Sequence, residues 1–242
     1  MTTSNFPNGA TNVADSVSLG SYVAQDPTKV HSWFDDFDTF SATTGTTGGS
    51  EWLLTAAAAA DTAAIEDADG GILLLTTDTA TADTVYLQWE GFQPTPVESW
   101  TFTTGTPMWF KCRLKLAVAA GAALICGLAV TDSSPLDASD GIYFLKAAGS
   151  ATMSLVVIAS STATTTTAKT MVDDTYTNLA WYYDGTDGID IFVDEVKVAR
   201  SVITNAPSTE LAVTLGIKNN NATPRTARID YIFVAKRRDT DI

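Results

Sequence analysis

The sequence predicts an all-β chain, folded as a two-sheet antiparallel sandwich of the jelly-roll type. Thr, Val, Ile and aromatic residues, the side chains that pack best on a pleated sheet, are abundant. Short runs of alternating apolar and polar residues recur between Gly- and Pro-containing turns, and no long stretch keeps a helical period. The 242 residues, of which 45% are hydrophobic, suffice for the core of one main domain.

Residues 181–200 give the clearest strand pattern. A turn-prone Asp-Gly-Thr-Asp-Gly segment precedes a strand whose Ile and Val residues share one face. A two-residue turn at 194–195 then predicts a hairpin that sets Ile191 opposite Val198, so that both strands bury apolar side chains on the same side. The opposite, wet face of this hairpin carries Asp190, Phe192 and Lys197.

The predicted domain is preceded by a polar segment. Residues 1–32 alternate poorly, so we expect an extended N-terminal arm that either lies along a partner or is disordered. The jelly-roll domain is predicted over residues 33–238, with a short C-terminal tail at 239–242. It opens with a strand at 33–40 that buries aromatic rings and turns the interleaved acids outward. The Ala-rich segment 56–64 is ambiguous between strand, loop and one helical turn.

The middle of the chain predicts a hairpin of two long strands. Residues 109–116 alternate between apolar and polar side chains, and residues 123–130 return with an apolar phase of their own. Cys112 and Cys126 therefore fall on adjacent strands and could face each other. We interpret them as buried thiols, since the chain is expected to be made in a cytoplasm. The threonine-rich segment 160–169 is expected to be a link.

Charge excludes some partners. The net charge is −14, which speaks against nucleic-acid binding because phosphate neutralisation needs a basic surface. No apolar run has transmembrane length and the N-terminus does not resemble a signal peptide, so neither a membrane contact nor export is expected. A single histidine, His31, placed in the arm, excludes most metal and catalytic-triad chemistry.

Several short motifs occur in an order shared with one group of folds. In chain order they include Phe34-Asp35-Asp36-Phe37, Gly70-Gly71-Ile72-Leu73, Gly127-Leu128-Ala129-Val130-Thr131-Asp132, Asp140-Gly141-Ile142-Tyr143-Phe144 and Ile229-Asp230-Tyr231-Ile232-Phe233-Val234. Over residues 33–235 this order resembles the concanavalin A-like (laminin G-like) jelly rolls, in particular those encoded among the structural genes of tailed bacteriophages. The resemblance implies that the first and last strands are neighbours, and it implies a capsid decoration role.

We therefore predict a non-enzymatic capsid decoration (cement) protein on the outer surface of a bacteriophage virion. Many copies would bind the major capsid protein and stabilise the shell, and a homotrimer would fit local symmetry axes. The contacts are assigned to the arm, to a cationic strand face and to the basic C-terminal edge. The predicted partner-binding residues are Phe6, Pro7, Asn8, Lys111, Arg113, Lys115, Arg225, Arg228, Lys236, Arg237 and Arg238.

The alternative function is carbohydrate binding by a lectin-like virion or fibre module. Exposed aromatic side chains such as Trp109, Tyr182 and Phe192 would then contact host glycans. The three cations that alternate with Trp109 on its strand would suit an acidic partner or an anionic glycan, or they would pair with the protein's own acids. Glycoside hydrolysis is not expected, because the Glu-x-Asp-x-x-Glu spacing of related glucanases is absent; Asp190 is interpreted as a solvated residue and Asp194 as a turn former.

Calcium is the one cofactor considered. A hard cation binds several oxygen ligands, and four carboxylates would approach one another if the first and last strands pair. The alternative is that these acids are simply solvated. The calcium candidates are Asp35, Asp36, Asp38 and Asp230.

Overall fold

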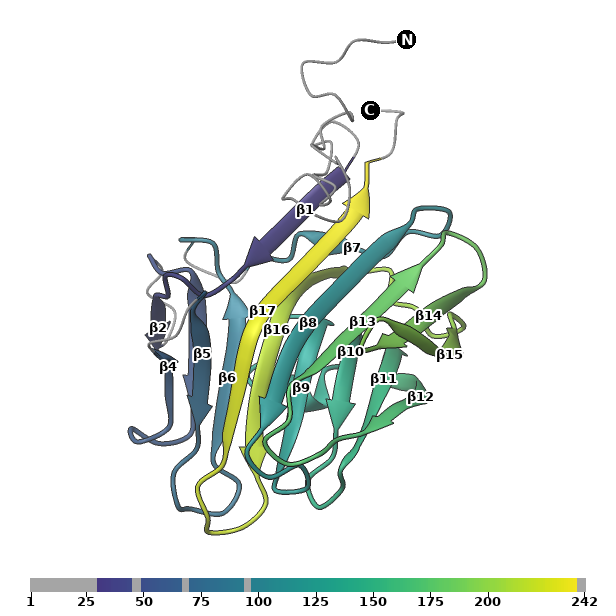
Figure 1. Cartoon of the computed structure of the whole chain (residues 1–242). Coiled ribbons are helices and arrows are strands. Elements are labelled where there is room, and N and C mark those ends of the chain that lie inside the picture. Colours follow the sequence, from purple (N-terminus) through teal and green to yellow (C-terminus); the bar gives the residue numbers. More distant parts are fainter. Residues whose placement is uncertain (1–29, 45–48, 67–69, 94–96, 239–242) are drawn as a thin grey trace, which may run out of the picture.

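The computed structural model describes residues 30–44, 49–66, 70–93 and 97–238. These residues form two packed sheets, in agreement with the predicted sandwich (Figure 1). The helix in these ranges is the single 3-10 turn η2 (Pro135–Asp137), and nothing in the described part is a helix long and apolar enough to cross a membrane.

The first sheet, called sheet 1, has the strand order β15-β14-β13-β8-β17-β5-β4, and β1 also pairs with β17. All of its neighbouring strands are antiparallel. Its strands are β1 (Val30–Asp35), β4 (Thr62–Glu66), β5 (Ile72–Thr76), β8 (Met108–Leu116), β13 (Thr177–Tyr183), β14 (Gly188–Val193), β15 (Val196–Val202) and β17 (Thr226–Arg237).

The second sheet, sheet 2, has the order β12-β11-β10-β9-β16-β6-β3-β2, and β7 also pairs with β16. Only the short β2–β3 pair is parallel among the described pairs. Its strands are β2 (Ala42–Thr44), β3 (Trp52–Ala56), β6 (Thr84–Trp89), β7 (Trp100–Thr101), β9 (Ala122–Ala129), β10 (Gly141–Lys146), β11 (Thr152–Ala159), β12 (Thr162–Thr170) and β16 (Glu210–Asn219).

The main core lies between the inner faces of the two sheets. Strand β8 shows the predicted alternation, with every second side chain buried from Met108 to Leu116. Aromatic residues link the layers: Phe110 stacks on Trp181 within sheet 1, with ring centroids 5.9 Å apart, and lies 6.3 Å from Phe144 of sheet 2. Burial of apolar surface in this layer supplies the main favourable term in folding.

The first and last strands are neighbours, as the resemblance implies. Strand β1 pairs with β17 from Val30 opposite Arg237 to Asp35 opposite Ile232, and Figure 1 shows purple β1 beside yellow β17. The predicted boundary between arm and domain, at residues 32 and 33, thus falls inside β1. His31 is part of this strand and stacks on Trp100, with ring centroids 4.4 Å apart. The remainder of the arm, with Phe6, Pro7 and Asn8, and the tail at 239–242 lie outside the described residues.

The phase expected for the first strand is wrong at two positions. The ring of Phe34 is 57% exposed, whereas Asp35 turns inward. The Asp35 carboxylate accepts hydrogen bonds from the backbone N–H of Phe37, at 2.8 Å, and from Nε1 of Trp52, at 3.3 Å. Burial raises the pKa of Asp35, and these two hydrogen bonds offset only part of that effect.

The predicted hairpin of residues 109–116 and 123–130 does not form. Strand β8 belongs to sheet 1 and β9 to sheet 2, so the turn between them crosses from one sheet to the other. Cys112 and Cys126 consequently meet across the core rather than along a hairpin, and both are free, buried thiols. Burial, followed by the hydrogen bond with Cys126, raises the pKa of Cys112 well above its usual range.

The threonine-rich segment forms an edge strand instead of a link. Strand β12 pairs with β11 along its whole length. Its connection to β11 runs through Ser160 and Ser161, which both have positive φ, as a tight hairpin turn requires. Threonine is β-branched and suits a strand, but a run of threonines shows no apolar alternation.

The hairpin of β14 and β15 forms, but its register differs from the prediction. A bulge between Ile191 and Phe192 sets Ile191 opposite Ala199 rather than Val198. One extra residue reverses the phase of the second strand, because successive side chains point to opposite faces. Val198 and Val202 are therefore exposed, at 45% and 55%, on the edge strand of sheet 1. Val196 keeps its predicted partner Val193 and is nevertheless 64% exposed, next to the turn.

Candidate functional site

A hollow of about 310 Å³ lies on the outer face of sheet 1, opposite the core. The small side chain of Ala180 in β13 faces it, between Lys111 of β8 and Phe192 of β14 in the strand register. A methyl group among larger neighbours leaves this space open. The residues around the hollow are Trp109, Phe110, Lys111, Ala180, Trp181, Tyr182, Phe192, Glu195 and Phe233.

Aromatic rings form most of its wall. Trp109 of β8 lies opposite Tyr182 of β13, and their rings stack with centroids 5.2 Å apart and an interplanar angle of 21°. Phe192 of β14 and Phe233 of β17 add two further rings from either side. All four side chains are partly exposed, because they occupy the outward phase of their strands.

A single ion pair supplies the charged groups at the hollow. Lys111 Nζ lies 2.5 Å from Glu195 Oε1. Burial alone would lower the pKa of Lys111, but the hydrogen bond that Lys111 donates to Glu195 helps to raise it overall, so the ammonium stays charged. Glu195 reaches this position from the tight β14–β15 turn, where Asp194 and Glu195 have φ of 49° and 68° without a glycine. The hollow thus has aromatic walls and one neutralised donor–acceptor pair.

The structure gathers the three aromatic residues that the sequence singled out for glycan contact. Trp109, Tyr182 and Phe192 come from three strands and surround the same hollow. Sequence reasoning missed Ala180 and Phe233. Phe233 alternates with buried neighbours near the end of β17, but a register shift between Ile229 and Tyr231 hides the phase of that strand when the chain is read from its start.

The cationic strand face beside Trp109 is neutralised by the protein's own acids. Besides the Lys111 pair, Arg113 forms an ion pair with Asp230, and Lys115 lies 2.7 Å from Asp174. Arg113 and Lys115 also stand over the ring of Tyr176, at 4.2 and 4.9 Å from its centroid. This matches the alternative in which these cations pair within the chain, so each would have to leave an acid to bind a partner.

The basic C-terminal residues are spread along β17 and do not form one patch. Arg228, near the start of this strand, makes a bidentate contact with Glu66 at 2.6 and 2.7 Å. Near the other end, Lys236 donates to Thr103 Oγ1 at 2.9 Å, and Arg237 donates to the carbonyl of Gly105 at 3.1 Å. Arg225 contacts Asn221 from the loop before β17. The assignment of these residues and of Arg238 to a partner stays a prediction.

The four calcium candidates do not form a set of metal ligands. Both oxygens of Asp35 accept hydrogen bonds, and Asp230 is engaged by Arg113. Burial raises the pKa of Asp36, and the charges of Asp38 and Asp230 raise it further. Although these acids lie near one another, no group of three or more His, Cys, Asp or Glu side chains in the described ranges is placed to hold a metal ion.

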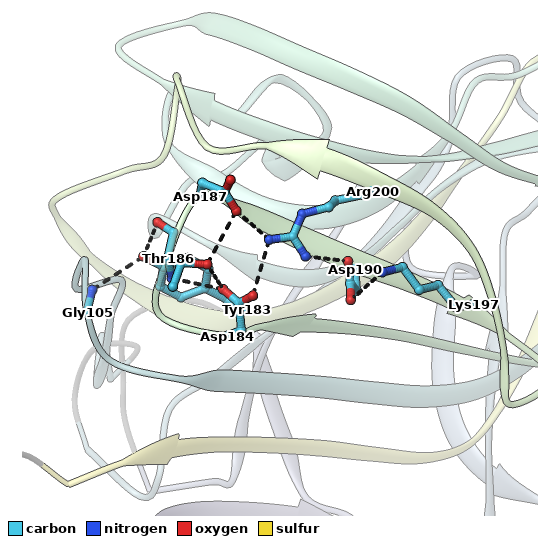
Figure 2. Close-up of polar contacts among 8 residues, drawn as sticks. All are labelled: Gly105, Tyr183, Asp184, Thr186, Asp187, Asp190, Lys197 and Arg200. Carbon is cyan, nitrogen blue, oxygen red and sulfur yellow. Dashed lines mark hydrogen bonds and ion pairs between the residues drawn. The ribbon is translucent and has the colours of Figure 1, made fainter.

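A second acidic cluster surrounds Arg200 at the β13–β14 turn (Figure 2). Its guanidinium contacts three carboxylates, those of Asp187 at 2.5 Å, Asp190 at 2.7 Å and Asp184 at 3.2 Å, and Lys197 adds a further pair to Asp190 at 2.7 Å. Asp190 is therefore an ion-paired residue with only 15% of its side chain exposed, not the solvated one expected. The cluster fastens the turn to β15.

Asp194 has the turn role predicted for it. One of its carboxylate oxygens accepts the backbone N–H of Asn178 at 3.0 Å, and the other lies 2.9 Å from Lys169 Nζ. Although burial opposes ionisation, these hydrogen bonds lower the pKa of Asp194 overall. Asp194 and Asp190 are thus both held by cations of the chain.

No family model matches this chain, and no curated protein matches it. Several solved structures are similar to this chain. The chain is similar to a protein of unknown function from Shewanella oneidensis MR-1, with a TM-score of 0.58 and 13% identity over 88% of this chain and 90% of that one. It is also similar to SCLam, a non-specific endo-beta-1,3(4)-glucanase from family GH16, with a TM-score of 0.56 and 14% identity over 89% and 94%. A third is a Bacillus licheniformis beta-glucanase, with a TM-score of 0.55 and 12% identity over 84% and 97%.

At these identities the likeness shows the fold. It confirms the two-sheet jelly roll and is consistent with the concanavalin A-like architecture. It gives no support to a bacteriophage origin.

The glucanase structures also correct one expectation. The missing Glu-x-Asp-x-x-Glu spacing predicts that the chain is not an enzyme. That expectation was wrong, because solved proteins with this fold over nearly their whole length include glycoside hydrolases. One absent motif does not exclude activity on such a scaffold, since the same fold hosts different sites.

Proposed function

We propose that this protein binds carbohydrate, with the hollow at Ala180 as its binding site. The observation that carries the proposal is the grouping of Trp109, Tyr182 and Phe192 around that hollow, with the Lys111–Glu195 pair beside them. A sugar ring has apolar C–H faces and hydroxyl edges. Aromatic walls suit the faces, and a side-by-side donor and acceptor suit the hydroxyl groups.

Several features favour a neutral sugar. Among the described residues that line the hollow, the two charged side chains, Lys111 and Glu195, form one ion pair, and the chain as a whole carries −14. An acidic polysaccharide would have to approach against that overall charge. Because two similar structures are described as a beta-glucanase and an endo-beta-1,3(4)-glucanase, β-linked glucans are the first ligands to test.

A glycan array followed by calorimetry tests the proposal. The full chain should bind one or more neutral glucans, and Ala180→Leu should reduce that affinity at least tenfold by filling the hollow from its base. Ala163→Leu is the matched control, since Ala163 is an exposed alanine on β12 of the other sheet. A wild-type chain that binds no glycan, or an Ala180→Leu variant that binds as tightly as wild type, would contradict the proposal.

The same samples address hydrolysis and the capsid role. Release of reducing ends from a soluble β-glucan would show that a bound glucan is also cut. The capsid decoration function, with the major capsid protein as partner, a trimeric state and a virion location, remains a prediction. Pull-down of the purified chain on empty phage shells would test it.

A further inference from the structure

Five residues on five adjacent strands form one row across the outer face of sheet 1. In the strand register Phe192 lies opposite Ala180, Ala180 opposite Lys111, Lys111 opposite Phe233, and Phe233 opposite Phe34. Residues paired in this way point to the same face of a sheet. The row therefore runs across the strands, from the hollow at Ala180 to β1.

Beyond the hollow, the row ends in an exposed aromatic pair. Phe34 is 57% exposed, and its ring centroid lies 6.2 Å from that of Tyr231, which neighbours Phe233 on the same face of β17. The hydroxyl of Tyr231 donates to Asn178 Oδ1 at 2.9 Å, which fixes the ring in place. An exposed phenylalanine against a fixed tyrosine ring contributes little to the core, and such exposed aromatic groups are typical of binding surfaces.

The spacing of the row sets the size of a ligand that would use all of it. From Phe192 to Phe34 there are four strand spacings of about 4.8 Å, or about 19 Å in all. A single sugar covers only the hollow, whereas an unbranched chain of several sugars can contact both ends. Between the two ends, the Lys111–Glu195 pair offers a donor and an acceptor without net charge.

We propose that the site is elongated and takes an unbranched, neutral oligosaccharide running across the strands, with a second stacking position at Phe34 and Tyr231. This inference rests on the proposed function. It assigns a role to Phe34, an exposed ring that the hollow itself does not include.

Calorimetric titration with glucose oligosaccharides of two to six units tests the inference. The affinity of the full chain should rise at least tenfold from the two-unit to the six-unit sugar. Phe34→Ala should lower the six-unit affinity about fivefold and leave the two-unit affinity unchanged. Val172→Ala, which truncates a side chain that is 56% exposed away from this row, should leave both affinities unchanged.

Four outcomes would overturn the elongated site. Equal affinity for short and long sugars, or an unaltered six-unit affinity in Phe34→Ala, would restrict the site to the hollow while the proposed function stands. Self-association of the wild type that is lost in Phe34→Ala, seen by sedimentation, would assign the row to a contact between copies. If no oligosaccharide of any length binds, the proposed function fails as well.

Discussion

The outer faces of the two sheets both carry aromatic side chains, but the rings differ in how far they are exposed. On sheet 1 the rings of Trp109 and Tyr182 stand beside an open hollow. On sheet 2 the rings of Tyr86 and Tyr143 lie flat on the strands and are each only 2% exposed. Glycines beneath the rings leave room for them: a Cβ on Gly141 would lie 2.7 Å from ring atoms of Tyr143, and a Cβ on Gly216 would lie 2.4 Å from Cδ1 of Tyr86.

The chain itself covers the second face. Leu136 of η2, with Ala138 just after it, packs on a small apolar cluster that includes Tyr143. Burial, and then the charge of Asp137, raises the pKa of Tyr143 to about 12, and that of Tyr86 likewise to about 12. One aromatic face is thus occupied by a segment of the chain and serves stability. The other has no such cover among the described residues, as the proposed ligand site requires.

Removing a covered ring should have the largest effect. Tyr143→Ala should lower the free energy of unfolding by about 3–5 kcal/mol, because it opens a cavity beneath η2. Tyr182→Ala, on the open face, should cost less than about 1.5 kcal/mol, since its ring is partly exposed. Urea unfolding followed by tryptophan fluorescence measures both. Equal losses would show that the two faces do not differ in the way described.

The buried lysine of sheet 2 differs from Lys111 on the outer face of sheet 1, because it shares the inward phase of Ile142 and Phe144 on β10. Lys146 of β10 is fully buried and donates to the carbonyls of Ala122, Ala147 and Ser150. Burial, and then the charge of Arg225, lowers the pKa of Lys146 to about 8. Lys146→Met should cost about 2 kcal/mol at neutral pH, because it leaves buried carbonyls unpaired.

The direction in which pH changes the stability depends on whether the folded or the unfolded chain holds more protons at Lys146. Between pH 8 and 10.5 the unfolded chain still holds the Lys146 proton while the folded chain releases it, so this residue makes folding more favourable as the pH rises. The stability gap between wild type and Lys146→Met should therefore widen over that range when both are unfolded in urea at each pH. Comparing the two proteins cancels the titration of Tyr and Cys. A gap that narrows or stays constant would contradict the lowered pKa.

On the open face, truncation should affect binding more than folding. Trp109→Ala removes the ring that stacks on Tyr182, and we expect a glucan affinity about tenfold lower. Its free energy of unfolding should stay within about 1.5 kcal/mol of the wild type, since the ring is partly exposed. Calorimetry and urea unfolding on the same preparation give both numbers. A variant that loses stability but keeps its affinity would reverse the roles of the two faces.

The smallest expected effect concerns the charge at the hollow. Glu195→Gln leaves Lys111 without its acid, and the change in stability should be below about 1 kcal/mol for so exposed a pair. The variant should bind uronic acid-containing glycans about twofold to threefold more tightly at low salt, and this gain should disappear at 1 M salt. An unchanged preference would show that the pair does not decide between neutral and acidic sugars.

Much of the fold, and part of the site, could be predicted from the sequence. Alternation in residues 109–116 correctly predicts which side chains of β8 enter the core, and the same alternation places Trp109 on the outer face. The partner sheet could not be predicted, because alternation does not distinguish a hairpin from a crossing between sheets. Cys112 and Cys126 illustrate this: alternation places both inward, but they lie on different sheets and meet across the core.

Strand bulges and long-range hydrogen bonds are the second reason why part of the structure could not be predicted from the sequence. A bulge in the β14–β15 pair reverses the phase at Val198, and a register shift in β17 hides the outward position of Phe233. The inward turn of Asp35 depends on Trp52, a residue distant in the sequence. Such features arise from tertiary contacts, so a local pattern contains no sign of them.

The most direct test is to locate the bound sugar by NMR. In a titration of the labelled full chain with a six-unit glucose oligosaccharide, the indole N–H of Trp109 and the amides of Ala180 and Phe192 should shift, while those of Ala138 and Tyr143 should not. Trp109→Phe assigns the indole signal. Shifts confined to Ala138 and Tyr143 would place the sugar on the covered face of sheet 2 and contradict the account.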